Sequence, residues 1–413
     1  MPRITRTIVL GISLAAIALG LGQSATAQQR PSGDLTQLPP VPTDYTPQKT
    51  AWGDYDFTGT WPYEFPAAAQ ILFQRPKGYG DRIWITDEEH AKRVVNAGKS
   101  DEAYSPENAG LQTQAGTQGM SDWIQKSDFS WRTSLLVSPQ NGQLPPLTPE
   151  GDALFKAGRS GWVPGQNFDF VDDFDTWDRC ITRGIPASMF PNRYNNALRL
   201  FQSPGYIVIQ VEILATRVIP IVDKKKAKDH WPHPMESWMG NSIAYWEGKT
   251  LVIDTTNIKS GDAVSHDLSK RSAAPVMVTM IGGAPRNTIP TSDKAHMIEK
   301  LTMTGPDSIL YEVTYDDPKT FTAPWTAQLE WSRNDDYFMP EYACHEGDVQ
   351  LRNYINANRA TRAAIAKGEL DPKDYDDGNR NFDRQFDRDP VAPLAPGEVP
   401  FGAPPPAPPK DAE

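Results

Sequence analysis

Histidine and glutamate side chains are the residues of this chain best suited to acid–base chemistry. The chain has only six histidines. Three of them lie in or beside predicted strands, with three glutamates close to them in sequence: His233, His296, His345, Glu299, Glu341 and Glu346. Imidazole and carboxylate together suit proton transfer near neutral pH, so these side chains could be catalytic if the fold brings them to one cavity. The alternative is that each histidine is a hydrogen-bonded structural residue.

Other catalytic motifs are incomplete. His230 and His233 have an H-x-x-H spacing, but a proline between them prevents a regular helix, and His230 follows three lysines, as a solvated loop residue would. Gly240 to Ala244 approximates a nucleophile elbow without its second glycine, and Gly78-Tyr79-Gly80 lacks the third glycine of a dinucleotide fingerprint. Three histidines with Glu346 could still assemble a zinc or iron site from distant strands. We predict neither a metal nor a cofactor.

Aromatic and arginine side chains are the candidate ligand-binding residues. Trp238 and Trp246 lie in or beside predicted strands and could line a cavity, although most strand tryptophans are expected in the core. Arg193 follows the acidic segment from Asp172 to Asp178, with which it could simply pair. An arginine near the mouth of a barrel could instead hold a carboxylate. We expect the partner to be a small hydrophobic or aromatic molecule.

Composition and charge exclude several protein classes. Hydrophobic residues are 38% and charged residues 23% of the chain, which contains 38 prolines and 30 glycines. These values exclude a coiled coil, a helical bundle and a polytopic membrane protein. The net charge is -11, whereas a nucleic-acid-binding protein needs a basic face, so nucleic acid is not an expected partner.

The N-terminal segment, residues 1–27, predicts export. Two arginines precede an apolar run from Ile8 to Leu21, which is short for a membrane span, and Ala25-Thr26-Ala27 is an A-x-A cleavage site. We expect the mature chain to begin at Gln28, in the periplasm or outside the cell, and not to span the membrane. In an oxidising compartment, the two cysteines predict a Cys180–Cys344 disulfide, with two free buried thiols as the alternative.

The chain divides into segments that differ in composition and in predicted secondary structure, and these segments must position the candidate residues. After the signal peptide we predict a proline-rich linker (28–50), an irregular elaboration with short helices (51–197), an antiparallel β-barrel (198–347), a closing helix (348–367) and a disordered proline-rich tail (368–413). Thr86 and Thr148 are expected to cap helices in the irregular segment.

The predicted strands follow one another through tight turns. Alternation in residues 207–213 puts four apolar side chains on one face, and Glu247-Gly248-Lys249 is a hairpin signal. Consecutive tight turns make antiparallel neighbours, so we predict a mainly β meander that closes into a lipocalin-like barrel, with a two-sheet sandwich as the alternative. In the last predicted strand, 337–344, alternation places Glu341 and His345 on one face and Glu346 on the other.

The strand region resembles a broad family of exported, mostly uncharacterised bacterial proteins. The shared stretches are Trp238–Ile243, Trp246–Thr255, Asp317–Lys319, Pro324–Thr326 and Glu341–Gly347. The likeness covers roughly residues 145–360, and Asp348 stands where relatives usually carry asparagine. The resemblance implies one exported β-rich domain and transfers no activity.

Two functions of different class fit these observations. The first is an exported enzyme that uses His/Glu acid–base chemistry on a small apolar or aromatic molecule, as a lyase, isomerase or hydrolase. The second is a non-catalytic periplasmic carrier that binds such a molecule inside the barrel. An enzyme needs at least two titratable groups facing one cavity, whereas a carrier needs an apolar cavity with one polar anchor.

Overall fold

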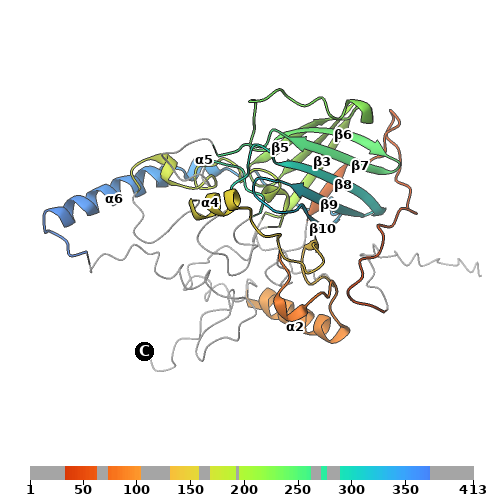
Figure 1. The fold of residues 1–413 in the computed structure, drawn as a ribbon, viewed down its shortest axis with the longest axis horizontal. Coiled ribbons are helices and arrows are strands. Elements are labelled where there is room, and N and C mark those ends of the chain that lie inside the picture. Colours follow the sequence, from red (N-terminus) through yellow and green to blue (C-terminus); the bar gives the residue numbers. More distant parts are fainter. Residues whose placement is uncertain are drawn as a thin grey trace, which may run out of the picture.

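The computed structural model is mainly β, with two antiparallel sheets and a few short helices (Figure 1). It describes residues 33–62, 73–103, 131–157, 168–191, 195–261, 271–276 and 289–372. The predicted signal peptide with Gln28, and nearly all of the predicted disordered tail, lie outside the described residues. No helix among the described residues is long and apolar enough to span a membrane.

The smaller sheet has the strand order β1-β3-β4-β5. Its strands are β1 (Gly59–Pro62), β3 (Ala197–Ser203), β4 (Tyr206–Val211) and β5 (Ala215–Pro220). Alternation gives β4 its two faces, because Ile207 and Ile209 are fully buried while Tyr206 is exposed. Gly205 adopts a positive φ of 79° in the turn between β3 and β4, a conformation that glycine adopts without strain.

The larger sheet has the strand order β2-β10-β9-β8-β7-β6. Its strands are β2 (Leu136–Ser138), β6 (Asn241–Glu247), β7 (Thr250–Thr256), β8 (His296–Gly305), β9 (Ser308–Asp316) and β10 (Trp325–Ser332). The predicted hairpin at Gly248 joins β6 and β7. The order of β6 to β10 therefore follows the chain, as a meander requires.

The two sheets meet at their edges without one continuous ladder among the described residues. At one edge an isolated parallel bridge joins Ile221, just after β5, to Ala244 of β6. At the other edge the Asn334 amide donates to the Thr60 carbonyl of β1. The inward side chains of both sheets belong to one hydrophobic cluster, which includes the fully buried Trp61 and Trp325. The coarse prediction of a mainly β fold is confirmed, whereas a closed barrel is not seen.

Short helices surround the sheets. They are η1 (Lys77–Tyr79), α2 (Asp87–Ala103), α4 (Pro149–Ala157), η4 (Val171–Asp173), η5 (Ala187–Met189), η6 (Lys224–Lys226), α5 (Cys344–Gly347) and α6 (Val349–Ala366). The predicted caps are confirmed. The Thr86 hydroxyl accepts from the Glu89 amide at 3.2 Å, the Glu89 carboxylate accepts from the Thr86 amide at 2.7 Å, and the Thr148 hydroxyl accepts from the Gly151 amide at 2.9 Å.

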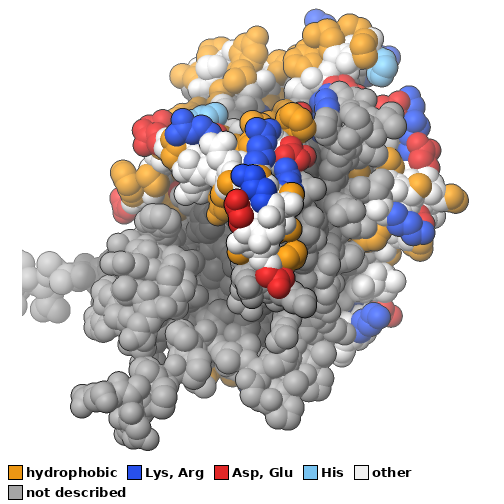
Figure 2. All heavy atoms as spheres, turned by 90° about the vertical axis from the view of Figure 1, so that its left-hand side faces the viewer, with side chains coloured by type: hydrophobic (Ala, Val, Ile, Leu, Met, Phe, Trp, Pro, Cys, Tyr) orange, Lys and Arg blue, Asp and Glu red, His pale blue; other side chains and the backbone are white. Residues whose placement is uncertain are grey.

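Helix α6 extends away from the sheets (Figure 1) and has no buried residue. Its side chains contact the segment around η4: Arg359 and Arg362 pair with Asp169, and the rings of Tyr354 and Phe174 lie 6.3 Å apart. From the side toward which α6 points, basic, acidic and hydrophobic side chains all lie on the described surface (Figure 2). The helix predicted over 348–367 is present, but it projects from the sheets and does not close a barrel.

Two details of the predicted strand plan are wrong. Residues 337–344 form no strand, and Cys344 begins the short helix α5. Pro340 lies inside this segment and has no amide to donate to a ladder, and β2 already pairs with Thr326 and Ala327 at the start of β10. The predicted start of the sheet region at residue 198 is also wrong, since β1 and β2, from the segment 51–197, pair with β3 and β10.

Candidate functional site

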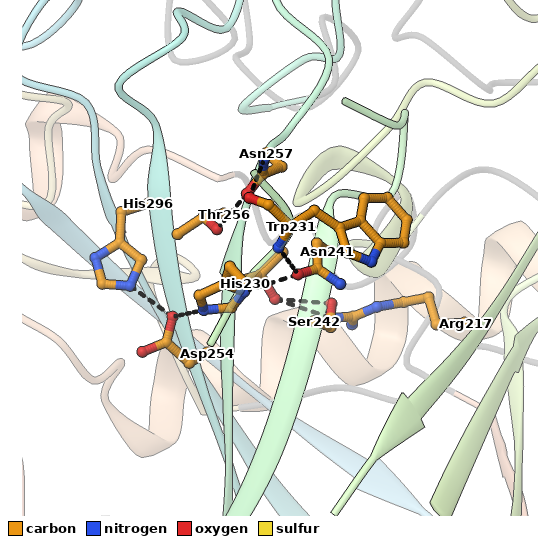
Figure 3. A network of polar contacts seen from close by, with 10 residues as sticks. Arg217, His230, Trp231, Asn241, Ser242, Asp254, Thr256, Asn257 and His296 are labelled. Atoms are coloured by element: carbon orange, nitrogen blue, oxygen red, sulfur yellow. Dashed lines mark hydrogen bonds and ion pairs between the residues drawn. The ribbon is translucent and has the colours of Figure 1, made fainter. Parts of the chain in front are cut away.

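The candidate site is a histidine–aspartate–histidine cluster on the outward face of the larger sheet. Asp254 lies on β7, His296 begins β8, and His230 comes from the loop after η6. The Asp254 Oδ1 atom lies 2.8 Å from His296 Nε2 and 3.1 Å from His230 Nε2. Figure 3 shows both imidazole rings directed at this one carboxylate. We call these three residues the His–Asp–His cluster.

A second hydrogen bond fixes the ring of His230. Its Nδ1 lies 3.1 Å from Asn241 Oδ1, which also accepts from the Trp231 backbone amide at 2.9 Å (Figure 3). The amide donor identifies that side-chain atom of Asn241 as oxygen, and the donor or acceptor role of each ring nitrogen of His230 depends on its tautomer. The loop is tied down further because Asn257 donates to the carbonyls of Trp231 and Met235. His230 is therefore held in place from both sides of its ring.

Asp254 and His296 shift each other's pKa, and His230 contributes to the shift of Asp254. Partial burial opposes ionisation of Asp254, but hydrogen bonds from His230 and His296 prevail and lower its pKa to about 2. The hydrogen bond with Asp254 raises the pKa of His296 against the effect of burial, and the negative charges of Asp254 and Asp316 raise it further. Asp254 is therefore an anion at neutral pH, and His296 holds a proton more readily than a free histidine.

His296 is the accessible member of the cluster. Its side chain is 43% exposed, against 11% for His230. Asp254 occupies its Nε2, so Nδ1 is the ring atom left to face a solute. A histidine oriented by a carboxylate through one nitrogen and open at the other is an arrangement that general acid–base catalysis uses.

A second polar cluster lies on the inward face of the same strands. Arg217 of β5 donates to both carboxylate oxygens of Glu299 on β8, at 2.8 and 2.6 Å. Arg217 also donates to the hydroxyls of Ser242 and Thr255, and the Tyr311 hydroxyl donates to Glu299 at 2.8 Å. The side chains of Arg217 and Glu299 are 2% and 0% exposed, so this ion pair links the two sheets inside the core.

The structure separates most of the predicted catalytic residues. His296 and Glu299 lie on opposite faces of β8, because three residues along a strand reverse the face. His233 is exposed in the loop after His230. The side chain of His345 is 80% exposed on α5 and contacts Asp348 at 3.8 Å.

Strand alternation does not apply to the predicted set near the C-terminal helices. Glu341 and Glu346 are exposed, Glu341 before α5 and Glu346 within it, so the expected shared strand face of Glu341 and His345 is wrong. Of the predicted residues only His296 belongs to the His–Asp–His cluster. Sequence reasoning missed Asp254 and took His230 for a solvated loop residue. The signal that could have found Asp254 was a carboxylate directly after the apolar run Leu251–Ile253, placed on the outward face by alternation.

The predicted ligand-binding residues are dispersed. Trp238 and Trp246 are partly buried against the core, and the Trp246 indole donates to Asp54 at 3.1 Å. Arg193 lies outside the described residues.

The disulfide prediction is confirmed, because Cys180 and Cys344 are joined with their Cα atoms 5.6 Å apart. Within the described ranges, Cys180, Cys344 and Asp348 are the only His, Cys, Asp or Glu side chains grouped closely enough to hold a metal ion. Both sulfurs belong to the disulfide, so they are not thiolate ligands.

Comparison with known proteins supplies no relative for this chain. No protein family, no curated protein and no solved structure matches it. The resemblance to exported bacterial proteins stays a prediction, and the function has to be inferred from the site itself.

Proposed function

We propose that this protein is an enzyme in which His296 transfers a proton to and from a small molecule. The observation that carries the proposal is the contact of Asp254 with Nε2 of both histidines, which leaves Nδ1 as the other ring nitrogen of the half-exposed His296. Isomerases, lyases and hydrolases of small molecules all use such a proton transfer, so the reaction class is this group.

The roles of the three residues follow from the geometry. Asp254 accepts a hydrogen bond from the Nε2–H of His296, which orients the ring and leaves the Nδ1 lone pair to remove a proton from the substrate. The imidazolium that forms is stabilised by the charges of Asp254 and Asp316. His230 is a positioning residue, because its hydrogen bonds to Asp254 and Asn241 hold the carboxylate in place.

The carrier alternative receives less support. A carrier would bind its ligand between the sheets, where the described inward side chains pack into one cluster around the Arg217–Glu299 ion pair. The proton-transfer proposal instead uses an accessible face of the larger sheet. These contacts therefore favour the enzyme over the carrier.

Two finer statements about fold and compartment belong to the same proposal. The contacts of β5 with β6 and of Thr60 with Asn334 favour a barrel-like arrangement of the two sheets. The Cys180–Cys344 disulfide is consistent with an oxidising compartment, which favours the periplasm or the cell exterior over the cytoplasm.

The test is to compare turnover by matched histidine variants. The mature protein is incubated with an extract of small metabolites, and products are followed by mass spectrometry. His296→Gln is expected to lower product formation at least tenfold, equivalent to about 1.4 kcal/mol of transition-state stabilisation. His345→Gln, which changes an exposed histidine outside the cluster, should keep the full rate. Equal rates for wild type and His296→Gln, with both proteins folded, would refute the proposal.

A further inference from the structure

We propose that the His–Asp–His cluster takes a neutral or cationic substrate that presents a hydrogen-bond donor, a hydroxyl or an ammonium group, and disfavours anions. This inference rests on the proposed function and names the substrate class of that site. It excludes carboxylates and phosphates, the commonest charged groups of small metabolites.

Negative charge predominates around His296. Asp254 contacts its Nε2, and Asp316 is its register partner on the neighbouring strand β9. Asp316 is exposed and acts on His296 through its charge. A substrate that approaches Nδ1 of His296 therefore meets one carboxylate behind the ring and a second beside it.

Positive side chains nearby are already paired. Lys294, two residues before His296, lies 3.4 Å from Asp293, which also pairs with Lys319 at 2.8 Å. Lys300, further along β8, pairs with Glu312 at 3.3 Å. Among the described residues, no lysine or arginine contributes to the pKa shift of Asp254 or of His296. Arg217 lies on the inward face, bound to Glu299. His230 is turned toward Asp254 and Asn241 and is mostly buried.

These groups define what the site can recognise. A neutral imidazole Nδ1 and the Asp316 carboxylate are both hydrogen-bond acceptors, so a hydroxyl or ammonium group can donate to them. A carboxylate or phosphate would bring its charge beside two carboxylates, and no arginine or lysine among the described residues forms an ion pair with Asp254 or Asp316. The same acceptors that bind a donor group would remove its proton in the proposed reaction.

The charge preference can be measured without knowing the substrate. Three reagents with one reactive group are compared: bromoacetamide, a bromoacetamide bearing a quaternary ammonium group, and bromoacetate. Each alkylates a neutral imidazole, as Nδ1 of His296 attacks the methylene carbon, bromide leaves, and the Nε2 proton stays with the resulting imidazolium beside Asp254. Rates at His296 come from peptide mass spectrometry and are divided by those of N-acetylhistidine amide in the same solution.

We expect His296 to be alkylated faster by the cationic or the neutral reagent than by bromoacetate. One unit charge about 6 Å away changes a rate in water by roughly threefold, so the bromoacetamide-to-bromoacetate ratio should exceed that of N-acetylhistidine amide by about three- to tenfold at low salt. The ratio should shrink in 1 M salt, where the Debye length is about 3 Å. The fastest reagent indicates which donor group the substrate carries. Fastest reaction with the cationic reagent indicates an ammonium group, and fastest reaction with neutral bromoacetamide indicates a hydroxyl group.

Two aspartate variants make the measurement specific. Asp316→Asn removes the charge beside His296 and should lower the ratio about threefold. Asp336→Asn removes one negative charge from an exposed turn after β10. This turn follows the end of β10 that is opposite to Trp325, the register partner of Tyr315, so the variant should leave the ratio unchanged. A ratio equal to that of N-acetylhistidine amide, or faster reaction with bromoacetate, would overturn the substrate class. The proposed function would then still be decided separately by the turnover of His296→Gln.

Discussion

Removing one partner of the buried ion pair between the sheets should lower the free energy of unfolding far more than removing both partners. Arg217→Met leaves the Glu299 carboxylate buried, with the Tyr311 hydroxyl as its remaining donor among the described contacts. Glu299→Gln leaves the Arg217 guanidinium buried without a counter-charge. Both side chains are almost fully buried, and removing one partner of such a pair costs about 3–5 kcal/mol. For a folded region of about 300 residues this corresponds to a fall in Tm of about 5–8 °C.

The double variant separates this explanation from simple loss of packing. With both charges removed, no unpaired charge remains, so Arg217→Met/Glu299→Gln should be no less stable than either single variant. Urea unfolding of the four proteins gives the coupling energy, which we expect to be at least about 2 kcal/mol. Lys92→Met, which removes one partner of the exposed Lys92–Glu88 pair, is the control and should cost less than about 0.5 kcal/mol. Single-variant losses that simply add in the double variant would refute the reasoning.

Two further predictions concern acidity and the disulfide. Because the pKa of Asp254 is lowered to about 2, its contribution to stability is present above pH 3.8 and is lost as pH falls toward 2, so urea unfolding should show wild type approaching Asp254→Asn over that range. The same variant should lower the pKa of His296, whose raised value depends chiefly on the Asp254 hydrogen bond, and an unchanged NMR titration would contradict this. Reducing the Cys180–Cys344 disulfide, which spans 164 residues, should destabilise the fold by about 4–5 kcal/mol in the chain-entropy model. A Cys180→Ser/Cys344→Ser protein should show no response to reductant, and a wild type equally indifferent would contradict the prediction.

Local patterns predicted the strands and helix caps well, because these depend on residues close in sequence. Alternation in β4 placed Ile207 and Ile209 inside, and the Thr86 and Thr148 caps needed only a hydroxyl before a helix. The false strand at 337–344 shows the limit of such patterns. Whether a β-compatible segment pairs depends on a free neighbouring edge and on its amide donors. β2 pairs with Thr326 and Ala327 of β10, and Pro340 removes one donor from the segment.

The candidate site was harder to predict because its members come from three separate segments. Asp254 and His296 meet through the register of β7 against β8, which aligns Thr255 with Met297. His230 joins them from a loop whose course depends on hydrogen bonds of Asn241 and Asn257. No spacing in the sequence encodes these contacts. The opposite faces of His296 and Glu299, in contrast, could have been deduced from alternation alone.

The position of the disulfide has a consequence for proteolysis. The loop that it closes, from Cys180 to Cys344, contains every strand from β3 through β10. Cleavage of any turn within that loop leaves both fragments covalently joined, so the cut ends cannot diffuse apart. A protein nicked in this way keeps its strands at high effective concentration and can retain its sheets, migrating as one species until a reductant is added. When a protease cuts an exposed loop, the Cys180–Cys344 disulfide can therefore keep the residues of the His–Asp–His cluster together.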